Sequence, residues 1–194
     1  MKALVIKQPG EAVAAQDTVA LIGCGGVGLG AIAASHFSGA CTIAVDVDDA
    51  KLNVAKKAGA DYAVNTSNEA PHHRVLELTD GLGPDVIIEA IGLLQTFRAA
   101  VEEVAFAGRV VYIGYTKEPV TYDTRLFVKK DLDVMGSRNA LPGDFRQVIQ
   151  MLEQRLFPVE EAVTAIVRIE EAPALLRAWT ENPSRFSKIM VSME

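Results

Sequence analysis

The sequence has little cysteine and no long hydrophobic run. Among its 194 residues, Cys24 and Cys41 are the only cysteines, too few for a disulfide framework and lacking the C-x-x-C spacing of a metal site. No apolar stretch is long enough to cross a bilayer, and the first residues lack the apolar segment of a secretory signal. These absences predict a cytoplasmic protein with no membrane partner.

Positive charge is also scarce. The formal net charge is −6, and no stripe of lysine and arginine runs along the chain, which argues against a nucleic-acid partner. Hydrophobic residues make up 49% of the sequence and charged residues 23%. This balance suits a globular domain with a sizeable core.

Apolar runs rich in valine and isoleucine alternate with longer segments of helical period. Strands are predicted at 17–23, 41–47, 61–65, 84–92, 108–115 and 131–138. Helices are predicted at 26–37, 48–60, 69–79, 95–105, 144–154 and 173–180, and a final strand at 188–193. Continuous apolar strands joined by helices imply a parallel sheet covered on both faces, an α/β doubly wound fold of the Rossmann type.

A glycine-rich loop separates the first predicted strand from the first helix. Gly23, Gly25 and Gly28 fit the pattern G-x-G-x-x-G in the context that gives this pattern meaning. Gly23 allows a tight turn, Gly25 lets a pyrophosphate approach the backbone, and Gly28 lets the helix lie close to the sheet. Free N–H groups at the helix start favour an anion, so Gly26 and Val27 complete the predicted binding loop.

An acid follows at the distance that a dinucleotide site requires. Asp46 lies 18 residues after Gly28 (46 − 28 = 18), at the end of the second predicted strand. Its carboxylate can accept hydrogen bonds from a ribose diol and would repel a 2′-phosphate, which favours NAD over NADP. The alternative is that the glycines form only a turn and Asp46 only caps the next helix.

Longer stretches resemble a known family. They are "DTVALIGCGGVGLGAIA", "IAVDVDDAKLNVAKKAGADYAVN", "TDGLGPDVIIEAIG", "GRVVYIGY", "DLDVMGSRN" and "RIEEAPALLRAWTENPSRFSKIMV". Together they resemble the coenzyme-binding domain of the zinc-type medium-chain alcohol and polyol dehydrogenases, over residues 16 to 194. The resemblance implies an oxidoreductase ancestry, NAD as cofactor, and a homodimer or larger assembly that pairs near 131–136.

The resemblance also implies roles for single residues. Lys51 would help to hold the adenosine ribose, and Lys188 would meet the pyrophosphate. The remaining positions would line the cofactor cleft, the last three of them beside the nicotinamide: Ile91, Gly92, Ile113, Gly114 and Tyr115. The alternative is that both lysines are solvated and that the other residues only pack.

The sequence departs from the family in the part that carries zinc. Residues 1–15 resemble the first strand of the family's catalytic domain, and the coenzyme domain follows directly from residue 16. No cysteine precedes the glycine loop, and Gly-His-Glu does not occur. The possible donors, Cys24, Cys41, His36, His72 and His73, do not assemble the three ligands of a catalytic zinc.

The sequence therefore predicts an NAD-binding domain with little or no zinc-dependent oxidation. Neither catalytic residues nor metal ligands are predicted, and zinc is expected for the family but not for this chain. Two other functions stay open. One is an active NAD-dependent alcohol or polyol dehydrogenase with unconventional ligands, and the other is an NAD-sensing or regulatory module. No tyrosine is followed by lysine four residues later, as short-chain dehydrogenases require.

Overall fold

The computed structural model describes residues 13–182 and 185–193. The chain divides into two compact units, one ending at Phe157 and one beginning at Pro158, and each is described by itself. The strand remnant predicted at 1–15 lies largely outside the described residues. In the described ranges, no helix is both long and apolar enough to span a bilayer.

The first unit contains a six-stranded parallel sheet, which confirms the predicted fold class. Its strands are β1 (Thr18–Ile22), β2 (Cys41–Asp46), β3 (Tyr62–Asn65), β4 (Val86–Glu89), β5 (Arg109–Tyr112) and β6 (Asp133–Gly136). The order across the sheet is β3-β2-β1-β4-β5-β6. The chain order reverses between β1 and β4, and sheets of this kind bind ligands at that point, beyond the carboxyl ends of the strands.

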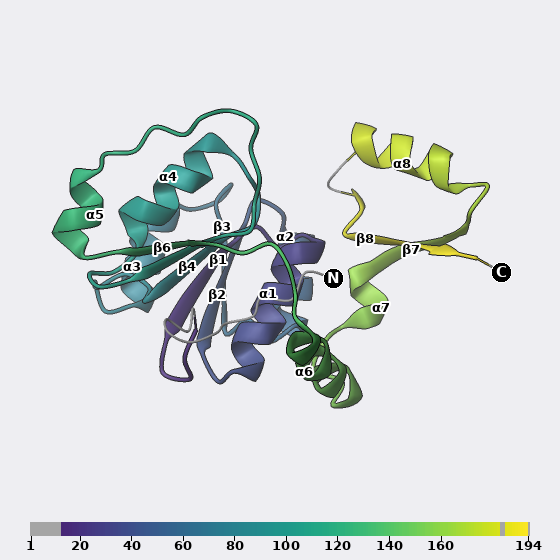
Figure 1. Ribbon diagram of the computed structural model, residues 1–194, viewed down its shortest axis with the longest axis horizontal. Coiled ribbons are helices and arrows are strands. Elements are labelled where there is room, and N and C mark those ends of the chain that lie inside the picture. Colours follow the sequence, from purple (N-terminus) through teal and green to yellow (C-terminus); the bar gives the residue numbers. More distant parts are fainter. Residues whose placement is uncertain (1–12, 183–184, 194) are drawn as a thin grey trace. The chain divides into compact units, whose positions relative to one another are not determined.

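Helices cover both faces of this sheet (Figure 1). They are α1 (Gly26–Phe37), α2 (Asp49–Lys57), α3 (Pro71–Leu78), α4 (Leu94–Glu103), α5 (Arg125–Lys130) and α6 (Pro142–Glu153). Helix α1 contacts α2 and α6, whereas α4 contacts α5 and meets α3 through the side chains of His72 and Glu103. The central strands are buried on both faces, as their predominantly apolar sequences predict.

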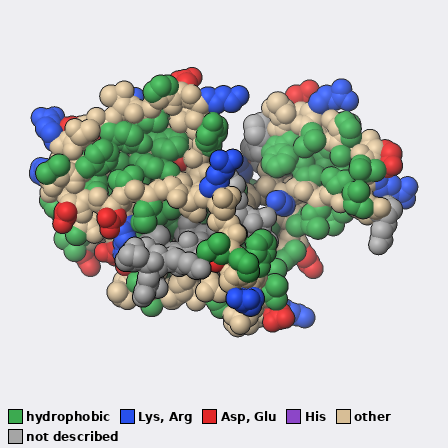
Figure 2. Space-filling view, viewed as in Figure 1, with side chains coloured by type: hydrophobic (Ala, Val, Ile, Leu, Met, Phe, Trp, Pro, Cys, Tyr) green, Lys and Arg blue, Asp and Glu red, His purple; other side chains and the backbone are tan. Residues whose placement is uncertain are grey.

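The second unit is a small β-α-β arrangement. It consists of α7 (Val159–Ala162), β7 (Val163–Arg168), α8 (Ala172–Glu181) and β8 (Lys188–Ser192), with β7 and β8 parallel. The ring of Trp179 packs near the buried ring of Phe186. Large apolar side chains stay exposed in this unit, among them Ile166 and Met190, and apolar surface is visible on both units in Figure 2.

The structure adds three elements that the sequence pattern did not predict, namely α5, α7 and β7. Helices α5 and α7 are too short to show a helical period. Strand β7 alternates between half-buried and exposed residues, unlike the continuous apolar strands of the first unit. The elements predicted elsewhere in the described ranges are present, with ends that differ by a few residues.

Candidate functional site

Two glycines of the loop between β1 and α1 are fixed by steric contacts. Gly23 has a φ of +101°, and a Cβ there would lie 2.5 Å from Cγ1 of Ile91. A Cβ on Gly28 would lie 1.7 Å from the carbonyl oxygen of Gly23, because α1 begins directly against the turn. A side chain at Gly23 would displace Ile91, and one at Gly28 would force the helix away from the turn.

Gly25 is different, because its surroundings are open. A Cβ there would have no heavy atom within 4 Å, and no side chain caps the helix. The first backbone hydrogen bond of α1 runs from the N–H of Leu29 to the oxygen of Gly25, at 2.8 Å. The N–H groups of Gly26, Val27 and Gly28 therefore precede the helical ladder, and with the helix dipole they favour an anion at this end.

Asp46 is bonded to this loop. Strand β2 pairs in parallel with β1, so its last residue lies beside the turn. Oδ2 of Asp46 accepts the N–H of Cys24 at 2.7 Å, and Oδ1 accepts the N–H groups of Val47 at 2.8 Å and Asp48 at 3.1 Å. The residue is 8% exposed. Asp46 does not cap α2, because Asp48 is the N-cap and accepts the N–H of Ala50 at 2.8 Å.

The charges of Asp46 and Lys51 act on the thiol of Cys24 in the loop. Burial, and then the charge of Asp46, raise the pKa of the Cys24 thiol, while the ammonium of Lys51 acts in the opposite direction. The thiol therefore stays protonated at neutral pH. The structure brings the loop and the acid together, and the role of Lys51 toward a ribose stays a prediction.

The loops that follow β4 and β5 form the other half of this edge. Gly92 has a φ of +91°, and a Cβ there would lie 2.6 Å from the oxygen of Tyr115. A Cβ on Gly114 would lie 2.5 Å from the nitrogen of Gly92. Ile113 is buried and Tyr115 is exposed. The predicted cleft residues after both strands thus lie together, and Ile91 joins them to Gly23.

Lys188 is the one predicted site residue outside the first unit. It begins β8, and its side chain is exposed. Its role toward a pyrophosphate stays a prediction.

Sequence reasoning missed one residue at this edge, Glu89. It ends β4 and is 0% exposed. Its Oε1 accepts hydrogen bonds from the N–H of Ile91 at 2.9 Å, the N–H of Gly92 at 2.7 Å and the hydroxyl of Thr96 at 2.7 Å. The available signal was a single acid within the apolar run "VIIEAIG".

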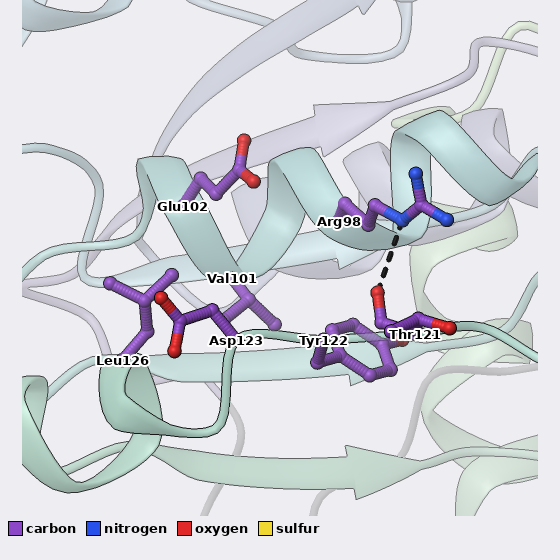
Figure 3. Close-up of a pocket in the computed structure, with 7 residues that line it drawn as sticks. All are labelled: Arg98, Val101, Glu102, Thr121, Tyr122, Asp123 and Leu126. Carbon is purple, nitrogen blue, oxygen red and sulfur yellow. Dashed lines mark hydrogen bonds between the residues drawn. The ribbon is translucent and has the colours of Figure 1, made fainter.

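A small pocket lies between α4 and the segment that precedes α5 (Figure 3). Arg98 points across it and donates from Nε to the oxygen of Thr121 at 3.1 Å, beside the ring of Tyr122. None of its lining residues belongs to the glycine loop or to the loops after β4 and β5. This pocket is therefore separate from the candidate site.

The described residues do not provide a zinc site. Within them, no group of three or more histidines, cysteines, aspartates or glutamates could hold a metal ion. The nitrogen Nδ1 of His72 is 2.6 Å from a carboxylate oxygen of Glu103, and both cysteines are free. This donor set does not fit a catalytic zinc, which needs three protein ligands around one ion.

Comparison with known proteins points to one family. Residues 26–154 match the family described as zinc-binding dehydrogenase. The chain is 30% identical over 173 residues to a zinc-type alcohol dehydrogenase-like protein of Haemophilus influenzae, covering 89% of this chain and 50% of that protein. It is 32% identical over 158 residues to an NAD-dependent alcohol dehydrogenase of Sulfurisphaera tokodaii, covering 80% of this chain and 45% of that protein.

Solved structures show the same fold. The 2R,3R-butanediol dehydrogenase of Bacillus subtilis superposes with a TM-score of 0.83 at 23% identity, covering 93% of this chain and 52% of that chain. The chain spans about half the length of the relatives that it matches.

Proposed function

Because this chain belongs to the zinc-binding dehydrogenase family, we propose that its first unit binds NAD at the carboxyl edge of the six-stranded sheet. The observation that carries the proposal is the 2.7 Å hydrogen bond between Asp46 and the N–H of Cys24. This bond fixes an acid beside an uncapped helix N-terminus, where a ribose and its phosphates can be held together.

The residues present fit such a cofactor. The open backbone at Gly25 and the N–H groups of Gly26, Val27 and Gly28 would hold the pyrophosphate. Asp46 and Lys51 would hold the adenosine ribose. The second half of the dinucleotide would lie against the loops after β4 and β5, at Ile91, Gly92, Ile113, Gly114 and Tyr115. When bound, NAD would supply the acceptor for a hydride.

The charges near Asp46 favour NAD over NADP. Oδ2 of Asp46 accepts one N–H in the structure, so it can also accept a ribose hydroxyl. A 2′-phosphate would meet Asp46, Asp48 and Asp49, and the segment 47–50 contains no arginine. Repulsion between these like charges disfavours NADP.

We propose that the described residues act without a zinc ion, since their donor set does not fit one.

Strand β6 is one edge of the sheet and exposes Val134. An open edge of this kind supports pairing with a second copy, so we propose a homodimer or larger assembly. The two free cysteines suit a reducing cytoplasm.

The test is calorimetric titration with NAD, NADH and NADP. We expect NAD and NADH to bind, NADP to bind at least tenfold more weakly, and Asp46→Ala to lose about tenfold or more in affinity for NAD. Asp48→Ala is the matched control, because it removes a neighbouring negative charge whose main contact is the cap of α2. Absence of dinucleotide binding at millimolar concentration would refute the proposal.

An active oxidoreductase is the second candidate, favoured by the similarity to the NAD-dependent alcohol dehydrogenase of Sulfurisphaera tokodaii. Steady NADH production from a panel of polyols, abolished by a chelator, would support this function. If NAD binds but the absorbance at 340 nm stays flat across the panel, the chain binds NAD without oxidising these polyols.

A further inference from the structure

Glu89 lies in the middle of the sheet at its carboxyl edge. In the register of the strands it is opposite Ile22 of β1 on one side and Tyr112 of β5 on the other. Its side chain has no exposed surface. A carboxyl group in such a place is costly to bury, so its hydrogen-bond partners decide whether the site can hold its charge.

One oxygen of Glu89 is fully used. Two backbone N–H groups, of Ile91 and Gly92, and the hydroxyl of Thr96 converge on Oε1 within 2.9 Å. The Thr96 hydroxyl carries one proton and also lies 2.9 Å from the oxygen of Leu93, so this proton is shared. Two backbone N–H groups and a shared hydroxyl directed at one oxygen suit an ionised carboxylate as their acceptor. The loop after β4 is therefore folded around a negative charge.

The other oxygen has no hydrogen-bond partner among the described residues. A Cβ on Gly114 would lie 2.1 Å from this Oε2, so the carboxylate fills the space that a side chain there would need. No ion pair between described residues includes Glu89. The negative charge is thus only partly compensated by its surroundings.

The field of this charge reaches its neighbours. The pKa of the Tyr112 hydroxyl is raised, first by burial, then by the contact with Tyr122, and also by the charge of Glu89. A group that binds against Gly92 and Gly114 would lie within the same field. The N–H of Gly92 donates to the Glu89 carboxylate, and Gly114 packs against both that carboxylate and Gly92.

The geometry of the proposed cofactor site indicates which part of the dinucleotide would bind against Gly92 and Gly114. Asp46 ends β2 and lies with the glycine loop, so the adenosine half belongs over β1 and β2. A dinucleotide crosses the switch point, and its nicotinamide half then lies over β4 and β5. The nicotinamide ring carries a positive charge in NAD⁺ and none in NADH, so a buried anion there acts differently on the two forms.

We propose that Glu89 is a positioning residue whose buried carboxylate shifts the preference of the site towards the oxidised cofactor, relative to the same site without this charge. The inference rests on the proposed binding of NAD. Its consequence is that the nicotinamide is harder to reduce when bound than it would be in the same site without this charge, because the two binding constants and the reduction potential are linked.

The test compares the dissociation constants of NAD⁺ and NADH for the wild type and for Glu89→Gln. The glutamine keeps the size of the side chain and an oxygen for the three donors but removes the charge. We expect the ratio Kd(NAD⁺)/Kd(NADH) to rise about tenfold. Calorimetry gives both constants, and the fluorescence of bound NADH provides a second measurement of one of them.

Thr96→Val is the matched control. It removes the 2.7 Å hydrogen bond to Oε1 but keeps the charge of Glu89. A merely structural role predicts that both variants weaken NAD⁺ and NADH equally, so the ratio would stay constant in both. The proposal predicts that the ratio moves in Glu89→Gln alone.

The outcomes separate the two proposals. If the wild type binds neither form, the proposed function fails and this inference with it. If both forms bind and the ratio is unchanged in Glu89→Gln, this inference alone fails. Should Glu89→Gln not fold, the wild type decides: the proposal predicts that NAD⁺ binds more tightly than the same dinucleotide with a neutral benzamide ring in place of the nicotinamide, and equal affinities overturn it.

Discussion

The two halves of the sheet edge end in acids with opposite surroundings. Asp46, after β2, keeps 8% of its surface exposed and spreads its hydrogen bonds over both oxygens. Glu89, after β4, is fully buried, with three donors on one oxygen and no partner for the other among the described residues. One acid faces a surface open to a ligand, and the other is inside the fold.

This difference shows that an acid at a strand end can serve a ligand directly or through the backbone around it. The half with β1 and β2 has an uncapped helix N-terminus and an open glycine, so its polar groups are free to bind. In the half with β4 and β5, the polar groups mainly bind one another, and the loops are packed through Gly92 and Gly114.

The largest expected effect comes from Gly28→Ala in the open half. The added Cβ would overlap the oxygen of Gly23 at 1.7 Å, and neither backbone segment can move alone. We expect the free energy of unfolding to fall by about 4 kcal/mol or more, measured by urea denaturation. A variant with wild-type stability would show that the helix is not held against the turn.

Next in size is Glu89→Ala in the closed half. It removes the acceptor of two N–H groups and one hydroxyl and leaves a cavity. We expect a loss of about 3 kcal/mol in the free energy of unfolding. For Asp46→Ala we expect about 1 kcal/mol, because its shorter side chain leaves a smaller cavity and keeps 8% of its surface exposed. Equal losses in the two denaturation curves would break the comparison between the two acids.

Gly25→Ala sharpens the comparison within the open half. Its φ of −73° suits alanine, and a Cβ there meets no atom within 4 Å, so we expect an unchanged melting temperature. The methyl group would stand where the pyrophosphate approaches, and we expect about a tenfold loss in NAD affinity by calorimetry. Retained affinity would place the phosphates elsewhere.

The smallest effect is expected for Thr96→Val in the closed half. The variant loses the hydroxyl, whose single proton is shared between Glu89 at 2.7 Å and the oxygen of Leu93 at 2.9 Å. Glu89 keeps its two backbone donors, so we expect a loss of about 1 kcal/mol in the free energy of unfolding. A loss as large as that of Glu89→Ala would assign the stability of this loop to Thr96.

Much of the fold was predictable because the sheet is buried on both faces. The run from Val19 to Ile22 is apolar throughout, and the helix from Gly26 to Phe37 begins and ends where the glycines predict. Strand β7 was missed because its alternating pattern marks a sheet with one open face, in a unit of only four elements.

The candidate site also has one part that the sequence predicts and one part that it does not. The glycine spacing and Asp46 follow a pattern whose physical reasons are local, so their positions could be derived from the sequence. Glu89 could not be placed, because its role depends on loops after two different strands and on the missing side chain of Gly114. A sequence shows an acid in a strand but not which distant N–H groups will meet it.

The strand order also has a consequence for how the chain folds. Strands β1, β2 and β3 follow one another in the sequence and pair side by side, so this half can form through local contacts. Strand β4 must return to β1 from beyond α3, which closes a longer loop and is expected to be slower. The switch point between β1 and β4 is therefore the junction between an early and a late half, and a ligand that binds across it would stabilise the folded state.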